Sequence, residues 1–160
     1  MIPARRMALS LAISTLCWVA NSCGAAGRGS PPCGAETATV AYVVDGDTID
    51  LADGRRVRYL LVDTPEIDTD DCFAANALDL NAALVMGKSV GLEYDVECED
   101  RYGRTLAYVR VSNRLVNSIL LERGYARLLV IAPNTHYVDE LRLLEAQARA
   151  TRAGLWGACP

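Results

Sequence analysis

The sequence predicts one mainly β domain with five strands and about three helices. Three observations favour this class. Short runs rich in β-branched and aromatic residues recur through the middle of the chain, Asp-Gly pairs separate the first three of them, and stretches with apolar residues at helical spacing follow. At 160 residues the chain is long enough for a single domain with a sizeable core.

The first three strands are predicted to form an antiparallel meander. Asp-Gly between apolar runs is the strongest short hairpin signal. In a meander the start of the middle strand lies near the end of its neighbour, so Asp47 is expected close to Asp63. The runs and their connecting pairs are, in order, residues 40–44, Asp45-Gly46, residues 48–51, Asp53-Gly54 and the run that starts at Val57.

The third run, residues 57–66, leads a buried strand into a group of oxygen ligands. Period-2 alternation places Arg58 on the face of Leu60 and Val62, which is costly unless the guanidinium is paired or faces a polar cavity. Pro65 pushes Thr64 to extended backbone angles and so fixes the direction of its carbonyl. An acidic surface turn is the alternative interpretation of this segment.

Helices and strands alternate in the remainder of the chain. Apolar residues at helical spacing predict a helix from Phe73 to Leu84, with Gly87 at its end and Asp70 or Asp71 available as its cap. The other predicted elements are strands at 89–94 and 105–111 around a charged turn at 100–104, a helix at 116–123 and a longer helix at about 138–152 with Leu141, Leu144 and Ala148 inward.

The polar residues suit phosphodiester hydrolysis. The negative oxygens of a phosphodiester repel nucleophiles, so a catalyst needs a cation, a base for water and donors for the developing charge. An all-oxygen ligand set suits Ca²⁺ better than Zn²⁺, and arginine presents a fork of donors to phosphate. The candidates are Asp47, Asp63 and the Thr64 carbonyl for metal, Glu66 for water, and Arg58 and Arg104 for phosphate.

Three separated motifs carry a resemblance. They are Asp45-Gly-Asp-Thr48, Arg58-x4-Asp63-Thr-Pro-Glu66, and Asp100-Arg-Tyr-Gly-Arg104 followed by Leu106-Ala-Tyr108. In order and spacing, over roughly Thr39 to Trp156, the chain resembles the thermonuclease (staphylococcal nuclease-like) family. The resemblance implies a five-stranded OB-fold barrel with about three α-helices and a Ca²⁺-dependent nuclease acting on DNA or RNA. It also implies that Asp45 supports the water shell of the metal, and that Arg101 and Tyr102 contact the terminal phosphate.

Other roles remain open for several of these residues. Asp45 is needed by its turn in any case, Tyr102 and Arg104 could belong to a solvated turn, and Tyr108 suits the core. His136 is expected to have a cap or surface role, because no Ser, Cys or second His partner is evident. A non-catalytic OB-type binding module is the competing function, although such modules tend to lose the carboxylates and arginines kept here. A surface lipoprotein with a structural calcium site would leave the two arginines unexplained.

The charge balance departs from that of a typical nucleic-acid enzyme. Without Arg5 and Arg6 the chain holds 14 basic and 20 acidic residues, a net charge of −6. The loop after Glu66 is acidic and short, and residues 129–132 are aliphatic where the family presents stacking tyrosines. We therefore expect weak nucleic-acid affinity with a shallow salt dependence.

The N-terminus predicts export. Two arginines precede the apolar run 7–20, which is too short to span a membrane and sits where a signal peptide places its apolar region. Cleavage near Ala25 or Ala26, or acylation of Cys23 as a lipid anchor, would each place the protein outside the cytoplasm as a secreted, periplasmic or envelope protein. The expected organisation is a signal at 1–24, a tether at 25–36 and a nuclease-like domain at 37–160, monomeric and without a transmembrane helix once processed.

Four cysteines remain in the expected mature chain, an even number suited to two disulfides. No Cys-x-x-Cys occurs, which argues against a zinc knuckle or a thioredoxin-type site. If Glu66 and Arg104 meet at one phosphate, the loops that carry Cys72 and Cys98 run close together. This reasoning predicts the pairs Cys72–Cys98 and Cys33–Cys159.

Overall fold

The computed structural model describes residues 33–69 and 71–160. The predicted signal, Cys23 with its predicted lipid anchor, and most of the predicted tether lie outside the described residues, as does Asp70.

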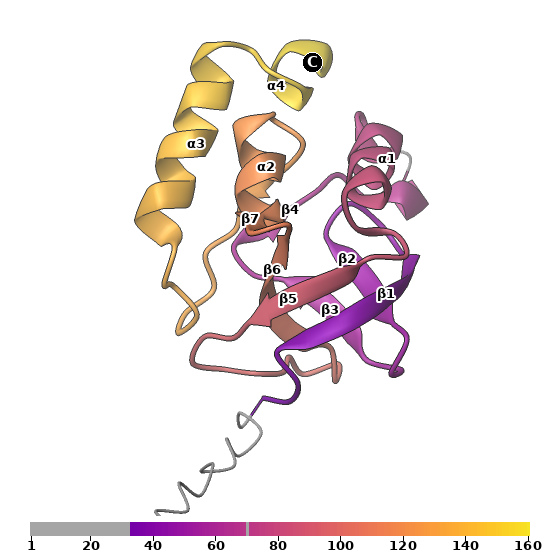
Figure 1. The fold of residues 1–160 in the computed structure, drawn as a ribbon. Helices are drawn as coiled ribbons and strands as arrows, with labels where there is room; N and C mark the ends of the chain where they lie inside the picture. The colour runs from indigo at the N-terminus through magenta and orange to yellow at the C-terminus, as the bar shows by residue number, and fades with distance from the viewer. Residues whose placement is uncertain (1–32, 70) are drawn as a thin grey trace, which may run out of the picture.

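The centre of the molecule is a closed barrel of five strands (Figure 1). The strands follow the order β3-β2-β1-β5-β6, and a parallel pairing of β3 with β6, in which Val57 lies opposite Thr105, closes the barrel. This confirms the predicted OB-fold barrel and its antiparallel meander. The strands are β1 (Thr37–Val43), β2 (Thr48–Leu51), β3 (Arg56–Tyr59), β5 (Ser89–Glu93) and β6 (Thr105–Val111).

The longer helices gather at one side of the barrel, as Figure 1 shows. They are α1 (Ala74–Val85), α2 (Val116–Glu122) and α3 (Val138–Ala150), and a short α4 (Leu155–Ala158) and a 3-10 turn η1 (Ile67–Thr69) add to them. The three predicted helices are therefore confirmed. No helix in the described part of the chain is long and apolar enough to cross a membrane.

The core fills the space between the barrel and the helices. Tyr59 and Tyr108 from the barrel and Leu120 from α2 are buried in it, so the core role expected for Tyr108 is confirmed. On α3, Leu141 and Ala148 are buried and Leu144 is partly buried against the same cluster.

The start of α1 differs from the prediction. The helix follows Phe73, whose φ of 76° is left-handed, and no side chain caps it. The carboxylate of Asp71 instead accepts a hydrogen bond from the Glu66 backbone N–H at 3.2 Å. Asp71 therefore closes the loop after the predicted site rather than capping the helix.

The strand predicted to start at Val57 and to stop at Thr64-Pro65 is not continuous. The chain turns at Leu60 and Leu61, and Leu61 has a φ of 61°, a region that branched residues rarely adopt. The side-chain amide of Asn117 donates to the Leu60 carbonyl at 2.7 Å and holds this turn. The second part, β4 (Val62–Asp63), pairs with β8 (Arg127–Leu128). A further short strand, β7 (Arg114–Leu115), pairs antiparallel with the end of β6.

The two predicted disulfides form, but their predicted pairing is wrong. Cys33 pairs with Cys98, with Cα atoms 5.1 Å apart, and Cys72 pairs with Cys159, with Cα atoms 5.8 Å apart. The segment before β1 runs beside β5 and reaches Cys98, because Thr37 pairs with Gly91. The C-terminal segment reaches Cys72, just before α1, instead. The predicted pairing assumed that the loops carrying Cys72 and Cys98 run close together, and this assumption did not give the correct disulfides.

Candidate active site

The turn between β1 and β2 brings Asp47 to the end of β4. Gly46 makes this possible, since a Cβ at that position would lie 2.7 Å from three atoms of the Thr64 side chain. Asp45 shapes the turn through its carboxylate, which accepts a hydrogen bond from the Asp47 N–H at 3.0 Å. The amide of Asn81 on α1 donates to the Asp45 carbonyl at 2.9 Å and fixes the turn from behind.

Asp47, Arg58 and Asp63 form one charged cluster. Nη2 of Arg58 lies 3.1 Å from Oδ2 of Asp47 and 2.9 Å from Oδ1 of Asp63. The Thr64 N–H donates to Asp47 Oδ2 at 2.9 Å, which places the Thr64 backbone beside both carboxylates. Nη1 of Arg58 donates to the carbonyls of Tyr59 and Val62, so the turn between β3 and β4 wraps around the guanidinium.

The cluster holds more negative charge than its arginine offsets. Burial raises the pKa of Asp47 to about 7, the Arg58 guanidinium opposes this rise, and Asp45 adds to it. Burial also raises the pKa of Glu66, with further contributions from Asp45 and Asp63. Asp45 and Arg58 influence the pKa of both Asp47 and Glu66, so these two carboxyl groups share charged neighbours.

The oxygen atoms in this cluster suit a hard cation. Asp47, Asp63 and the Thr64 carbonyl all offer oxygen donors. Burial is the main cause of the raised pKa of Asp47, and a cation beside this carboxyl group would favour its ionised form. This set has two acidic side chains and one backbone carbonyl. Within the described residues, no three His, Cys, Asp or Glu side chains gather closely enough to hold a metal by themselves.

The second part of the site is the turn between β5 and β6. Asp100 closes it by accepting hydrogen bonds from the backbone N–H groups of Tyr102 and Arg104, and its Oδ2 lies 2.7 Å from Arg104 Nε. Burial opposes ionisation of Asp100, yet these donors outweigh it and hold the Asp100 pKa below its ordinary value. Tyr102 is 68% exposed, and the guanidinium carbons of Arg101 and Arg104 lie 4.7 and 5.6 Å from its ring centre.

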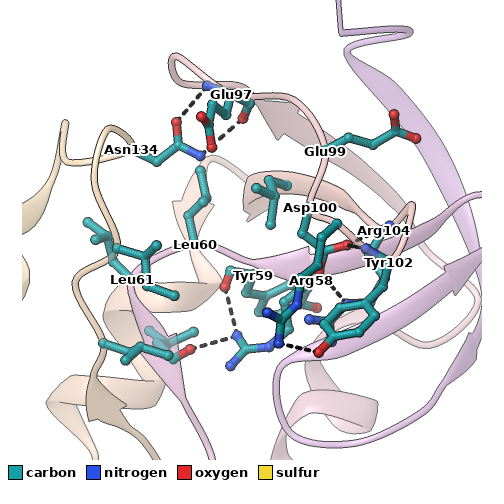
Figure 2. A pocket seen from close by; sticks show the side chains of 15 residues that line it. Arg58, Tyr59, Leu60, Leu61, Glu97, Glu99, Asp100, Tyr102, Arg104 and Asn134 are labelled. Atoms are coloured by element: carbon teal, nitrogen blue, oxygen red, sulfur yellow. Dashed lines mark hydrogen bonds and ion pairs between the residues drawn. The ribbon is translucent and has the colours of Figure 1, made fainter.

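Both predicted phosphate-binding arginines line one pocket of about 510 Å³ (Figure 2). Arg58 enters from β3 and Arg104 from the β5–β6 turn, together with Arg101 and Tyr102. Asp47, Asp63, Thr64 and Glu66 are not among the lining residues. Since Arg58 contacts both Asp47 and Asp63, its guanidinium lies between the carboxylate cluster and the pocket.

An apolar wall completes the pocket. Leu129 and Ile131 line it, and they are 38% and 65% exposed. They belong to the aliphatic stretch at 129–132, so this wall of the pocket offers aliphatic side chains.

Sequence reasoning missed Asn134, which holds this wall in place. Asn134 is 2% exposed, its Oδ1 accepts from the Glu97 N–H at 2.7 Å, and its Nδ2 donates to the Glu97 carbonyl at 3.0 Å. The only sequence signal was an Asn shortly before a helix, which suggests a cap. His136 is exposed and its backbone N–H donates to Asp95 Oδ2, in keeping with the surface role expected for it.

Comparison with known proteins identifies the family. Residues 56–158 match the family described as Staphylococcal nuclease homologue. The chain belongs to this family. It is 40% identical over 127 residues to endonuclease YncB of Bacillus subtilis (strain 168), covering 74% of this chain and 60% of that protein.

Two further relatives have similar names. The SPbeta prophage-derived endonuclease YokF of the same organism is 38% identical over 127 residues, or 74% of this chain and 43% of YokF. The thermonuclease of Staphylococcus hyicus is 34% identical over 128 residues, which is 76% of each chain. The chain thus spans less than two thirds of the length of the two Bacillus relatives and about three quarters of the staphylococcal one.

Proposed function

We propose that the protein is a Ca²⁺-dependent phosphodiesterase that hydrolyses DNA or RNA. The observation that carries this proposal is the convergence of Arg58 and Arg104 in one pocket, beside a buried cluster of carboxylates. Membership of the nuclease family and the endonuclease and thermonuclease names of its relatives support hydrolysis of nucleic acid.

In this mechanism the two arginines bind the phosphate. Arg58 is held by the carbonyls of Tyr59 and Val62, so its guanidinium is oriented before substrate arrives. Arg104 is oriented by Asp100 through its Nε, which leaves its terminal nitrogens toward the pocket as donors. Charge that develops on the phosphoryl oxygens is stabilised by these preorganised donors.

Glu66 is the group assigned to water. Its exposed position gives it access to solvent, and its raised pKa makes it a better proton acceptor than an ordinary glutamate. Arg101 and Tyr102 are assigned to the terminal phosphate, since they line the pocket beside Arg104.

Asp47, Asp63 and the Thr64 carbonyl are assigned to Ca²⁺, with Asp45 supporting its water shell. When bound, Ca²⁺ supplies positive charge against the phosphoryl oxygens. The fit rests on the hard oxygen donors and on the buried position of Asp47, where a cation would favour the ionised carboxylate that burial disfavours.

We further propose an extracytoplasmic location and a monomeric enzyme with nucleic acid as its partner. The two disulfides support an oxidising compartment. Secretion and lipidation depend on residues before Cys33. N-terminal sequencing and the mass of the purified protein would distinguish cleavage of a signal peptide from acylation of Cys23.

Digestion of single-stranded DNA and RNA, with Ca²⁺ or with chelator, tests the function. Cleavage is expected with Ca²⁺ and should stop in chelator, and Asp63→Ala should lose the metal-dependent activity. Full activity in chelator would overturn the calcium mechanism. Binding of both nucleic acids without cleavage under any condition would favour the competing non-catalytic OB-type module.

A further inference from the structure

Two arginines stack on one tryptophan near the C-terminus. The guanidinium carbon of Arg127, from β8, lies 5.3 Å from the ring centre of Trp156, and that of Arg149, from α3, lies 4.1 Å from it. Arg127 is exposed and the Arg149 side chain is 54% exposed. A guanidinium stacked on a ring keeps its N–H edge available for phosphate oxygens.

Two further arginines lie on the segments beside this stack. Gly124 and Gly154 are in backbone contact, since a Cβ on Gly154 would lie 2.2 Å from the Gly124 carbonyl oxygen. Arg123 and Arg152 flank this contact and are exposed. We call the surface formed by Arg123, Arg127, Arg149 and Arg152 around Trp156 the basic edge.

Few acidic groups oppose the basic edge. Glu145 pairs with Arg149 at 3.0 Å, but it is largely buried and also accepts the Leu128 N–H. Among the described residues, Arg123, Arg127 and Arg152 have no carboxylate within ion-pair distance. The negative net charge of the chain therefore conceals a local excess of positive charge.

The basic edge continues from the candidate active site. Arg127 is the register partner of Asp63 in the β4–β8 pair, and opposite residues of an antiparallel pair share a face. Two residues farther along, Leu129 lines the pocket. A strand that leaves the pocket past Asp63 would therefore meet Arg127 first.

A disulfide also fixes the basic edge to the site. Cys159, three residues after Trp156, is bonded to Cys72 in the segment that follows Glu66. The covalent link limits movement of Trp156 relative to the loop that carries Glu66.

We propose that the basic edge binds the phosphate backbone of a single-stranded nucleic acid beyond the scissile position. This inference rests on the proposed function, because it extends the same substrate site. It also predicts a steeper salt dependence of nucleic-acid binding than the composition alone suggests. The stacked arginines supply phosphate contacts, and the Trp156 ring holds both guanidinium groups close to it.

Fluorescence anisotropy of the full chain in chelator tests the proposal without hydrolysis. The probes are a dinucleotide and an oligodeoxynucleotide of about 12 nucleotides, within the range that one OB fold covers. The variants are Arg127→Gln and Arg149→Gln. Arg142→Gln is the matched control, because Arg142 lies on the same helix as Arg149 and is paired with Asp139.

For the longer probe, each edge variant should lower the salt slope by about 0.7, so the affinity gained between 1 M and 0.1 M salt falls about fivefold. Dinucleotide binding and the control should not change. Salt slopes equal to that of the wild type in both edge variants would overturn the proposal. A loss of affinity that appears only together with a lowered melting temperature would also overturn it, because it would mean that the stack stabilises the fold without binding phosphate. Should either stacking variant unfold, Arg123→Gln gives the same test outside the stack. Failure of the proposed function would be seen separately. In that case the salt slope of binding would still depend on the edge arginines, but the protein would cleave no nucleic acid.

Discussion

Arg58 and Asp47 form an ion pair of 3.1 Å with side-chain exposures of only 13% and 3%. Asp47 belongs to the turn before β2 and Arg58 to β3, so the pair joins neighbouring strands at the edge of the pocket. A buried charge left without its partner is far more costly than a surface charge. The pair therefore links the chemistry of the site to the stability of the barrel.

Arg58→Ala should both slow turnover and destabilise the protein. From the sequence alone, the fold is expected to stay intact in this variant. The structure predicts a loss of about 3 kcal/mol in the free energy of unfolding, because Asp47 would remain buried without its guanidinium. Urea unfolding measures this, with Arg142→Ala as an exposed control that should change stability by less than about 1 kcal/mol. An Arg58→Ala protein as stable as the control would contradict the prediction.

Arg104→Ala should separate activity from stability. Its ion pair with Asp100 is at the rim and a third of its side chain is exposed, so removing it should cost less than about 1 kcal/mol. Turnover should nevertheless fall by about 10² to 10³ through loss of a preorganised donor. Arg114→Ala, which removes a long surface pair with Glu122, is the control and should leave the rate unchanged. Equal rates for the two variants would remove Arg104 from the mechanism.

Asn134→Ala should weaken substrate binding through the pocket wall. The substitution leaves the Glu97 N–H and carbonyl without their buried partner, and we expect a loss of about 2 kcal/mol in the free energy of unfolding. The loop with Leu129 and Ile131 would also lose its anchor, so KM should rise more than kcat falls. The neighbouring exposed Thr135→Ala is the control. A lower stability with unchanged KM would mean that Asn134 holds the loop without shaping the pocket.

Acid should weaken the attachment of α3 to the barrel. Glu93 accepts hydrogen bonds from Tyr137 Oη at 2.6 Å and Arg110 Nε at 3.0 Å. Burial opposes ionisation of Glu93, but these donors hold its pKa below the ordinary 4.5. A depressed folded-state pKa gives stability that is present above the unfolded pKa and is lost as the pH falls through the folded one.

Glu93→Gln should therefore cost up to about 1 kcal/mol near neutral pH, because the carboxylate is a third exposed. The difference from wild type should shrink as the pH falls below 4.5. Urea midpoints at several pH values measure it. In an Arg110→Gln background the same substitution should have a smaller effect, and an equal effect there would assign the stabilisation to another group.

Signals from neighbouring residues were enough to predict the barrel. The features that these signals did not predict depend on contacts between distant parts of the chain. Asp-Gly turns and β-branched runs are properties of a few neighbouring residues, which is why β2 and β6 have their predicted bounds. The turn at Leu60 depends instead on the Asn117 amide, which comes from α2. Arg58, Asp63 and Arg104 were identifiable by residue type and motif. Asn134 and Arg127 were not, because their partners are 37 and 64 residues away in the chain.

The disulfides give the most direct test of how the chain is arranged. Peptide mapping of the unreduced protein should recover Cys33–Cys98 and Cys72–Cys159, and a Cys72–Cys98 peptide would contradict the fold described above. The bridges close segments of 65 and 87 residues, so each should contribute about 4 to 5 kcal/mol in the chain-entropy model.

Their removal should affect the site differently. Replacing Cys72 and Cys159 by Ser frees the C-terminal segment from the loop that carries Glu66, so it should reduce both stability and binding of long single strands. Replacing Cys33 and Cys98 frees the segment before β1, which lies on the barrel away from Trp156 and should affect stability alone. Comparing the salt slopes of the two double variants, at a temperature where both remain folded, measures this difference. If the slopes match, the Cys72–Cys159 bridge stabilises the fold without positioning the basic edge.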